Sequence, residues 1–173
     1  MDNKNYVKQI LYFILYLSIQ VIFIKNVVLF GRGFCFLYIV FLLLLPLEIG
    51  PLALMLIGFL TGFIVDVFYD SLGMHAAACV LIMFLRPHLM NVLTPRGGYE
   101  QVPVPTLKLM GLEWFSTYTF ILVFIHSMAL FYIEAGGFNR FFFTFSKVIS
   151  SSILTFILII ILQYLFYMPK RRI

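Results

Sequence analysis

The sequence predicts an all-α integral membrane protein, in which about six transmembrane helices form a single domain over residues 1–173. Hydrophobic residues make up 63% of the chain and charged residues 11%, whereas soluble domains are about 25% charged. The apolar runs are continuous, as in membrane helices, and do not alternate as they do in barrel strands. One helical crossing takes about 20 residues. Six crossings therefore fill most of the chain and leave room for loops only.

The first apolar segment extends from about Ile10 to Phe30. Lys4 and Lys8 precede it, as in a signal sequence, but no cleavage site of small residues follows. We therefore expect an uncleaved first membrane helix.

The second apolar run, residues 33–68, is too long for one crossing and contains its own break at Pro46-Leu-Glu-Ile-Gly-Pro51. Prolines and a glycine this close together indicate a turn. The run thus divides into a second segment, about Phe34–Leu45, and a third, about Pro51–Phe68. Because the second segment is short for a full crossing, a partly re-entrant path is an open alternative.

Three further segments follow, separated by one long polar stretch and one short loop. The polar stretch is Thr94–Gly111, which is rich in proline and glycine. The expected helices are the fourth, about Gly73–Leu93; the fifth, about Trp114–Ala135; and the sixth, about Val148–Met168.

The distribution of lysine and arginine predicts the orientation. With six crossings, eight of these residues fall on one side and four on the other. The positive-inside rule then places both termini in the cytoplasm. If the short second segment does not cross, the termini fall on opposite sides instead. The eight are Lys4, Lys8, Arg86, Arg96, Lys108, Lys170, Arg171 and Arg172. The net charge of +5 suits contact with anionic membrane lipid, and no basic stripe interleaved with aromatic residues indicates a nucleic-acid partner.

The densest group of candidate functional residues is the stretch GFLTGFIVDVFYDSLG, Gly58–Gly73. Gly58 and Gly62 have the GxxxG spacing that lets two membrane helices approach closely. Asp66 follows one turn later, and polar groups within a membrane are rare and functionally suggestive. We expect Asp66 to be buried and bonded to His126 or to the backbone that opens the next helix at Gly73.

Two interpretations of Asp66 stay open, a helix-end cap and a polar contact that organises the bundle or a partner interface. Proton transport is less favoured, because a relay needs more such groups. The other candidates for buried polar or partner-interface positions are Tyr69, Asp70, Gly73, His126 and Glu134.

The polar stretch supplies a second candidate surface on the cytoplasmic side. Its prolines disfavour helix at the preceding residues, so we expect it to be extended. The interface candidates there are Pro103, Pro105, Lys108, Glu113 and Trp114.

Nothing in the sequence indicates an enzyme, a metal or a cofactor. His75, His88 and His126 lack the spacing of a metal site. The serines at 150–152 have no accompanying histidine and aspartate in a recognisable order. We therefore expect a non-catalytic protein.

The Gly58–Gly73 stretch resembles the bacterial rod shape-determining protein family MreD, which has a glycine-spaced helix, an aspartate, an aromatic residue and then Leu-Gly before the next helix. The second half resembles MreD of the Bacteroidetes type. The matching stretches are VPTLKLMGLEWF (Val104–Phe115), Ile125-His126 with Phe131-Tyr-Ile-Glu134, and SSSILTFILIIILQYLF (Ser150–Phe166).

This resemblance implies an inner-membrane scaffold of the cell-wall elongation machinery that maintains cell shape. It implies a bitopic partner, MreC, and through it the actin-like MreB, the peptidoglycan polymerase RodA and its transpeptidase. The family's membrane domain is similar to the substrate-binding subunits of energy-coupling-factor vitamin transporters. Such a subunit is the alternative function, but the first helix lacks the small residues spaced by four with which those subunits dock. A membrane scaffold of another complex is a third possibility.

Overall fold

The computed structural model describes residues 3–29, 31–100, 102–137 and 140–167. The chain is mostly helical over these residues, with one two-stranded antiparallel ribbon. In chain order the elements are α1 (Asn3–Ile19), the π-helical turn η1 (Gln20–Ile24), β1 (Val28–Leu29), β2 (Gly33–Phe34), α2 (Ile39–Leu43), α3 (Pro51–Tyr69), α4 (Met74–Val92), α5 (Leu107–Met110), α6 (Leu112–Glu134) and α7 (Phe141–Tyr167).

Four helices, α3, α4, α6 and α7, are long and apolar enough to span a membrane. This finding supports a membrane-embedded helical protein. The expected count of six transmembrane helices is not confirmed, since the apolar helix at Gln9–Ile24 is shorter and α2 has only five residues. The boundaries of the third, fourth and fifth predicted segments agree with α3, α4 and α6 within about two residues.

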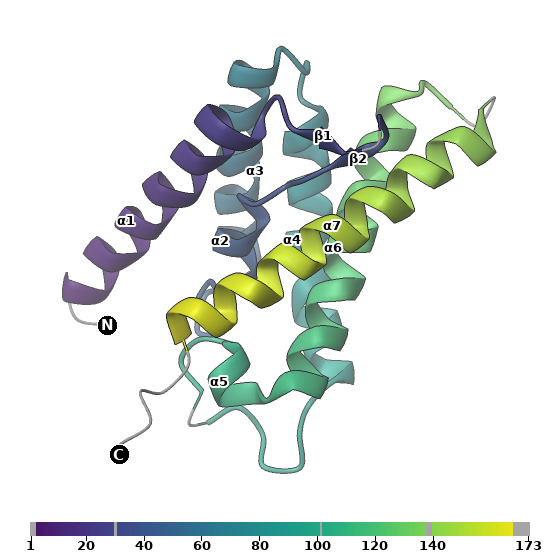
Figure 1. Cartoon of the computed structure of the whole chain (residues 1–173). Coiled ribbons are helices and arrows are strands. Elements are labelled where there is room, and N and C mark those ends of the chain that lie inside the picture. Colours follow the sequence, from purple (N-terminus) through teal and green to yellow (C-terminus); the bar gives the residue numbers. More distant parts are fainter. Residues whose placement is uncertain (1–2, 30, 101, 138–139, 168–173) are drawn as a thin grey trace.

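Two helical hairpins dominate the arrangement (Figure 1). One consists of α3 and α4, and the other of α6 and α7. The α3–α4 turn, the β1–β2 ribbon and the α6–α7 loop lie at one end, which we call the turn end. At the opposite, α5 end lie α5, the start of α1 and the end of α7.

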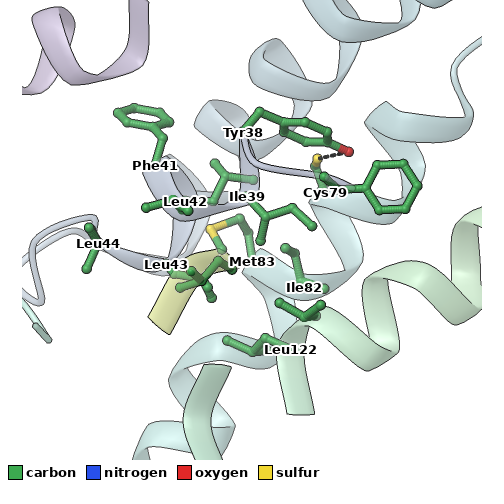
Figure 2. Packing of buried hydrophobic residues seen from close by; sticks show 14 of the residues in the cluster. Tyr38, Ile39, Phe41, Leu42, Leu43, Leu44, Cys79, Ile82, Met83 and Leu122 are labelled. Carbon is green, nitrogen blue, oxygen red and sulfur yellow. Dashed lines mark hydrogen bonds between the residues drawn. The ribbon is translucent and has the colours of Figure 1, made fainter. Parts of the chain in front are cut away.

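The prediction of a second helix over Phe34–Leu45 is wrong for most of that segment. Only Ile39–Leu43 is helical, and the chain passes from the turn end to the α5 end largely without regular structure (Figure 1). Residues 35–45 are nevertheless the most buried stretch of the chain, each at most 8% exposed. We call residues 33–45 the central segment. Figure 2 shows its side chains packed against Cys79, Ile82, Met83 and Leu122.

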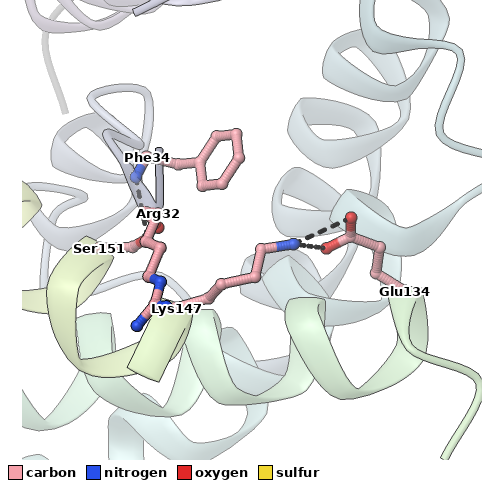
Figure 3. Close-up of polar contacts among 5 residues, drawn as sticks. All are labelled: Arg32, Phe34, Glu134, Lys147 and Ser151. Atoms are coloured by element: carbon pink, nitrogen blue, oxygen red, sulfur yellow. Dashed lines mark hydrogen bonds and ion pairs between the residues drawn. The ribbon is translucent and has the colours of Figure 1, made fainter. Parts of the chain in front are cut away.

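Side chains of the surrounding helices satisfy the backbone of the central segment. Ser151 Oγ accepts from the Phe34 amide at 2.9 Å (Figure 3), and Thr155 Oγ1 accepts from the Phe36 amide at 3.1 Å. A non-helical backbone is tolerated at membrane depth only where protein supplies such partners. These contacts are the reason that the segment crosses the bundle without forming a full helix.

Two buried donors perform the same task nearer the α5 end. The Arg86 guanidinium, 1% exposed, donates to the Leu45 carbonyl and, at 2.8 Å, to Tyr118 Oη. Tyr118 in turn donates to the Leu43 carbonyl at 3.0 Å. Arg86 thus lies inside the bundle and not in a loop. Without it the lysine and arginine distribution expected for six crossings is seven against four (8 − 1 = 7).

The first predicted helix also ends earlier than expected, at Ile24. Beyond it the chain turns, and β1 pairs with β2 through a loop that includes Gly31 at φ +67°. The sixth predicted helix corresponds to α7, which begins at Phe141, seven residues before the predicted start at Val148. The intervening residues combine four phenylalanines with Thr144, Ser146 and Lys147, so hydropathy alone gave no clear boundary there.

We expect Gln20→Leu to destabilise the protein strongly. Gln20 is 1% exposed; its amide donates to the Cys35 carbonyl at 3.0 Å and accepts from the Leu37 amide at 2.6 Å. Leucine would leave both backbone groups unpaired, at about 1–3 kcal/mol each. Thermal unfolding in detergent measures this loss. The exposed Ile22→Leu is the matched control on the same turn, and equal melting temperatures for the two variants would contradict the assigned role.

Candidate functional site

Asp66 caps the following helix from across the α3–α4 turn. Its Oδ1 accepts from the His75 amide at 3.0 Å and from Ser71 Oγ at 2.5 Å, and its Oδ2 accepts from the Ala76 amide at 2.9 Å. These amides belong to the first turn of α4, whose N-cap residue, Gly73, has no side chain to accept from them. Asp66 therefore supplies the cap that the local sequence lacks, and it is only 5% exposed.

The glycines of α3 make this cap reachable. A Cβ atom at Gly62 would lie 2.5 Å from Ala76 Cα and 2.5 Å from the His75 carbonyl oxygen. At Gly58 the corresponding distances are 2.8 Å to Met83 Cγ and 3.0 Å to the Cys79 carbonyl oxygen. The two helices thus touch backbone to backbone at Gly62. One turn later, this close approach brings Asp66 to the amides of α4.

The turn that joins α3 to α4 holds two non-glycine residues in the left-handed region. Asp70 has φ +55° and Leu72 has φ +47°, followed by Gly73 at +87°. A left-handed conformation costs a non-glycine residue roughly 1–2 kcal/mol. Leu72 is also 100% exposed, so no packing within the described chain explains a leucine there. Strained and exposed residues of this kind are candidates for function.

Tyr69 ties the end of α3 to the end of the first helix. Its hydroxyl accepts from Gln20 Nε2 at 2.6 Å, and the Lys25 ammonium lies 5.6 Å from the centre of its ring. Lys25 also donates to the Phe68 carbonyl. Among the candidates on this turn, Tyr69 is therefore engaged within the protein, while Asp70 is exposed.

His126 does not bond to Asp66, contrary to one of the expected pairings. It is fully buried, and its Nε2 lies 2.7 Å from Tyr38 Oη. His75 Nδ1 lies 2.8 Å from the same hydroxyl. Sequence analysis did not single out Tyr38, because a tyrosine in an apolar run gives no signal of its own. The resulting His75–Tyr38–His126 cluster fixes the central segment between α4 and α6.

Glu134 lies at the turn end but on α6, away from Asp66. It forms an ion pair with Lys147 of α7 at 2.8 Å (Figure 3). Lys147 also lies over the rings of Phe34 and Phe131, at 5.3 Å and 4.7 Å from their centres. The structure therefore does not bring Glu134 and Asp66 into one site.

The residues of the polar stretch divide into exposed and packed ones. Pro103, Lys108 and Glu113 are exposed. Pro105 is buried, and Trp114 donates to the Leu93 carbonyl at 2.7 Å and stacks on Tyr118. The expectation of an extended stretch is wrong in part, because α5 begins after Thr106, whose side chain caps it. Pro103, Lys108 and Glu113 are therefore the most accessible of these candidates to a partner.

An open apolar groove of about 980 Å³ lies beside the α3–α4 turn. Phe59, Phe63 and Val67 of α3 line one wall, and Val80 and Phe84 of α4 line the other. Asp66 and Asp70 also line the groove, at its turn end. The groove offers a long apolar surface that ends in polar groups.

No metal centre is present among the described residues, where no three His, Cys, Asp or Glu side chains are arranged to hold an ion. Both cysteines are buried and unpaired. No protein-family model, no curated protein and no solved structure matches this chain. The candidate site is thus defined by its own geometry: the capped α3–α4 turn and the groove beside it.

Proposed function

We propose that the protein is a non-catalytic multi-pass membrane scaffold of the cell-wall elongation machinery, which maintains cell shape together with an MreC-like bitopic partner. In this proposal it lies in the bacterial inner membrane with both termini in the cytoplasm. The actin-like MreB, the polymerase RodA and its transpeptidase are reached indirectly, through that partner. The proposal starts from the resemblance of Gly58–Gly73 and of the second half to the MreD family.

The observation that carries the proposal is the α3–α4 turn. Its buried polar residue, Asp66, is used entirely for internal hydrogen bonds, and the same turn holds Leu72 strained and fully exposed. A hydrogen-bonded turn that presents an apolar side chain suits recognition of another protein better than chemistry on a substrate.

The groove beside this turn supports a helical partner. A single transmembrane helix of a bitopic protein could lie along the apolar walls at Phe59, Phe63 and Phe84. Its chain would leave the membrane beside Asp70 and Leu72. On the α5 side, exposed Pro103, Lys108 and Glu113 provide a second, polar surface.

Depletion of the protein in its native cell tests the function. We expect rod-shaped cells to become round or swollen, with the chemical composition of peptidoglycan unchanged, and a bitopic partner to co-purify in mild detergent. Normal shape together with loss of uptake of one vitamin would overturn the scaffold in favour of the energy-coupling-factor subunit.

Leu72→Gly sharpens the same experiment, because it separates stability from function. Glycine relieves the left-handed strain, so the variant should unfold at the same or a higher temperature, with a gain of up to about 1 kcal/mol. It removes the exposed side chain, so it should rescue depleted cells poorly and retain less partner. The control is Leu52→Ala, which removes another exposed leucine side chain without placing a glycine in α3. Full rescue by Leu72→Gly would exclude the turn as the partner surface.

A further inference from the structure

A second concave site lies at the turn end, between the end of α6 and the start of α7. It has a volume of about 410 Å³ and is lined in part by Phe131, Glu134, Arg140, Phe143 and Lys147. Unlike the groove on α3 and α4, it combines charged groups with aromatic walls. The pocket is not part of the proposed scaffold surface, so a ligand for it has to be inferred separately.

Positive charge exceeds negative charge around this pocket. Lys147 is 16% exposed and paired with Glu134, and Arg140, which also lines the pocket, is exposed. Arg32 adds a second guanidinium, 5.5 Å from the centre of the Phe143 ring and 3.2 Å from Ser146 Oγ. Arg140 and Lys147 line the pocket together with one carboxyl group, Glu134, and Arg32 lies beside it against Phe143 (Figure 3 shows Arg32, Lys147 and Glu134). An anionic ligand would balance the remaining positive charge.

The position of the pocket narrows the class of ligand. It lies where α6 ends and α7 begins, and both helices are long and apolar enough to span a membrane, so their junction suits the depth of lipid headgroups. Arginine binds phosphate in a planar, two-pronged geometry, and the start of a helix favours negative charge. Phe141, Phe142 and Phe143 are exposed beside it, at 43%, 87% and 50%, and suit contact with acyl chains.

We propose that this pocket binds the phosphate group of an anionic phospholipid, with Arg140 as its ligand and with Lys147 and the neighbouring Arg32 as contributing charges. The site would fix a lipid against the α6–α7 hairpin and the β1–β2 ribbon. Because the salt bridge to Glu134 partly neutralises Lys147, Glu134 limits the affinity of the site.

Native mass spectrometry of the purified full chain in neutral detergent tests this, with phosphatidylglycerol as the probe and phosphatidylcholine as the uncharged comparison. We expect selective retention of phosphatidylglycerol. Arg140→Gln should weaken its binding about fivefold, since each basic residue near an anionic lipid contributes about 1 kcal/mol. Arg32→Gln combined with Arg140→Gln should weaken it further. Arg96→Gln, an exposed arginine at the α5 end, changes the net charge equally and should leave binding unchanged.

Glu134→Gln should change the affinity for phosphatidylglycerol in the opposite direction, which misfolding of the variant would not do. It should tighten phosphatidylglycerol binding, because it releases the charge of Lys147. Wild-type affinity in the Arg32 and Arg140 double variant, or no preference for phosphatidylglycerol over phosphatidylcholine, would overturn the proposal. Inorganic phosphate is the third arm: if phosphate alone stabilises the wild type as strongly as the lipid does, the ligand is free phosphate and the lipid assignment is wrong.

Discussion

Gly62→Ala should disrupt the bundle, although alanine adds only one methyl group. A Cβ atom there would meet the backbone of Ala76 and His75 at 2.5 Å, and backbone atoms cannot move aside as a flexible side chain can. Overpacking of a close contact costs about 1–3 kcal/mol or more. The separation of α3 from α4 would also pull Asp66 away from the amides it caps. We expect low accumulation in membranes and a large fall in melting temperature.

Two other glycines serve as controls for this experiment. Gly97→Ala has open space around its Cβ position and an ordinary φ, so it should behave as the wild type. Gly58→Ala should be intermediate, because its nearest neighbour is a side-chain atom, Met83 Cγ, and the Cys79 carbonyl oxygen lies farther away at 3.0 Å than the backbone atoms that face Gly62. If Gly62→Ala accumulates and melts as Gly97→Ala does, the close helix contact at Gly62 is absent in the membrane.

The sequence was informative where a helix is long, apolar and bounded by turn residues. The helices α3, α4 and α6 could be located because proline and glycine flank them, as Gly50-Pro51 and Gly73 do. The GxxxG spacing also indicated which face of α3 packs closely. That inference requires only local periodicity, because residues four apart share a helix face.

The central segment could not be predicted, because its conformation depends on distant residues. An apolar run such as Phe34–Leu45 has the hydropathy of a helix, and nothing local reveals that its amides are satisfied by Ser151, Thr155 and Gln20. The same limit hid Tyr38, which joins two histidines that are far apart in the sequence. Hydropathy reports burial in an apolar phase, whereas the choice between helix and irregular backbone depended on tertiary hydrogen bonds.

The substitution of Asp66 by leucine should be among the most damaging single changes in this protein. Leucine would leave the His75 and Ala76 amides and the Ser71 hydroxyl without their acceptor. Each unpaired buried group costs about 1–3 kcal/mol, so the free energy of unfolding should fall by several kcal/mol. Asparagine has nearly the same shape and keeps one carbonyl oxygen. Asp66→Asn should therefore retain part of the cap and be clearly better tolerated.

Thermal unfolding in detergent, together with the amount of protein in membranes, measures the two variants side by side. Asp70→Asn and Asp70→Leu are the matched controls, because Asp70 lies on the same turn but is exposed. There the leucine variant should lose at most about 1–2 kcal/mol relative to the asparagine variant, because asparagine tolerates the left-handed φ of +55° better, whereas the gap at Asp66 should be larger. If instead Asp66→Leu and Asp66→Asn unfold at the same temperature, the amides of α4 do not depend on the carboxyl group. In that case the close helix contact at Gly62 would hold the turn by packing alone. A second substitution at Gly62 would then be needed to destabilise the Asp66→Leu variant.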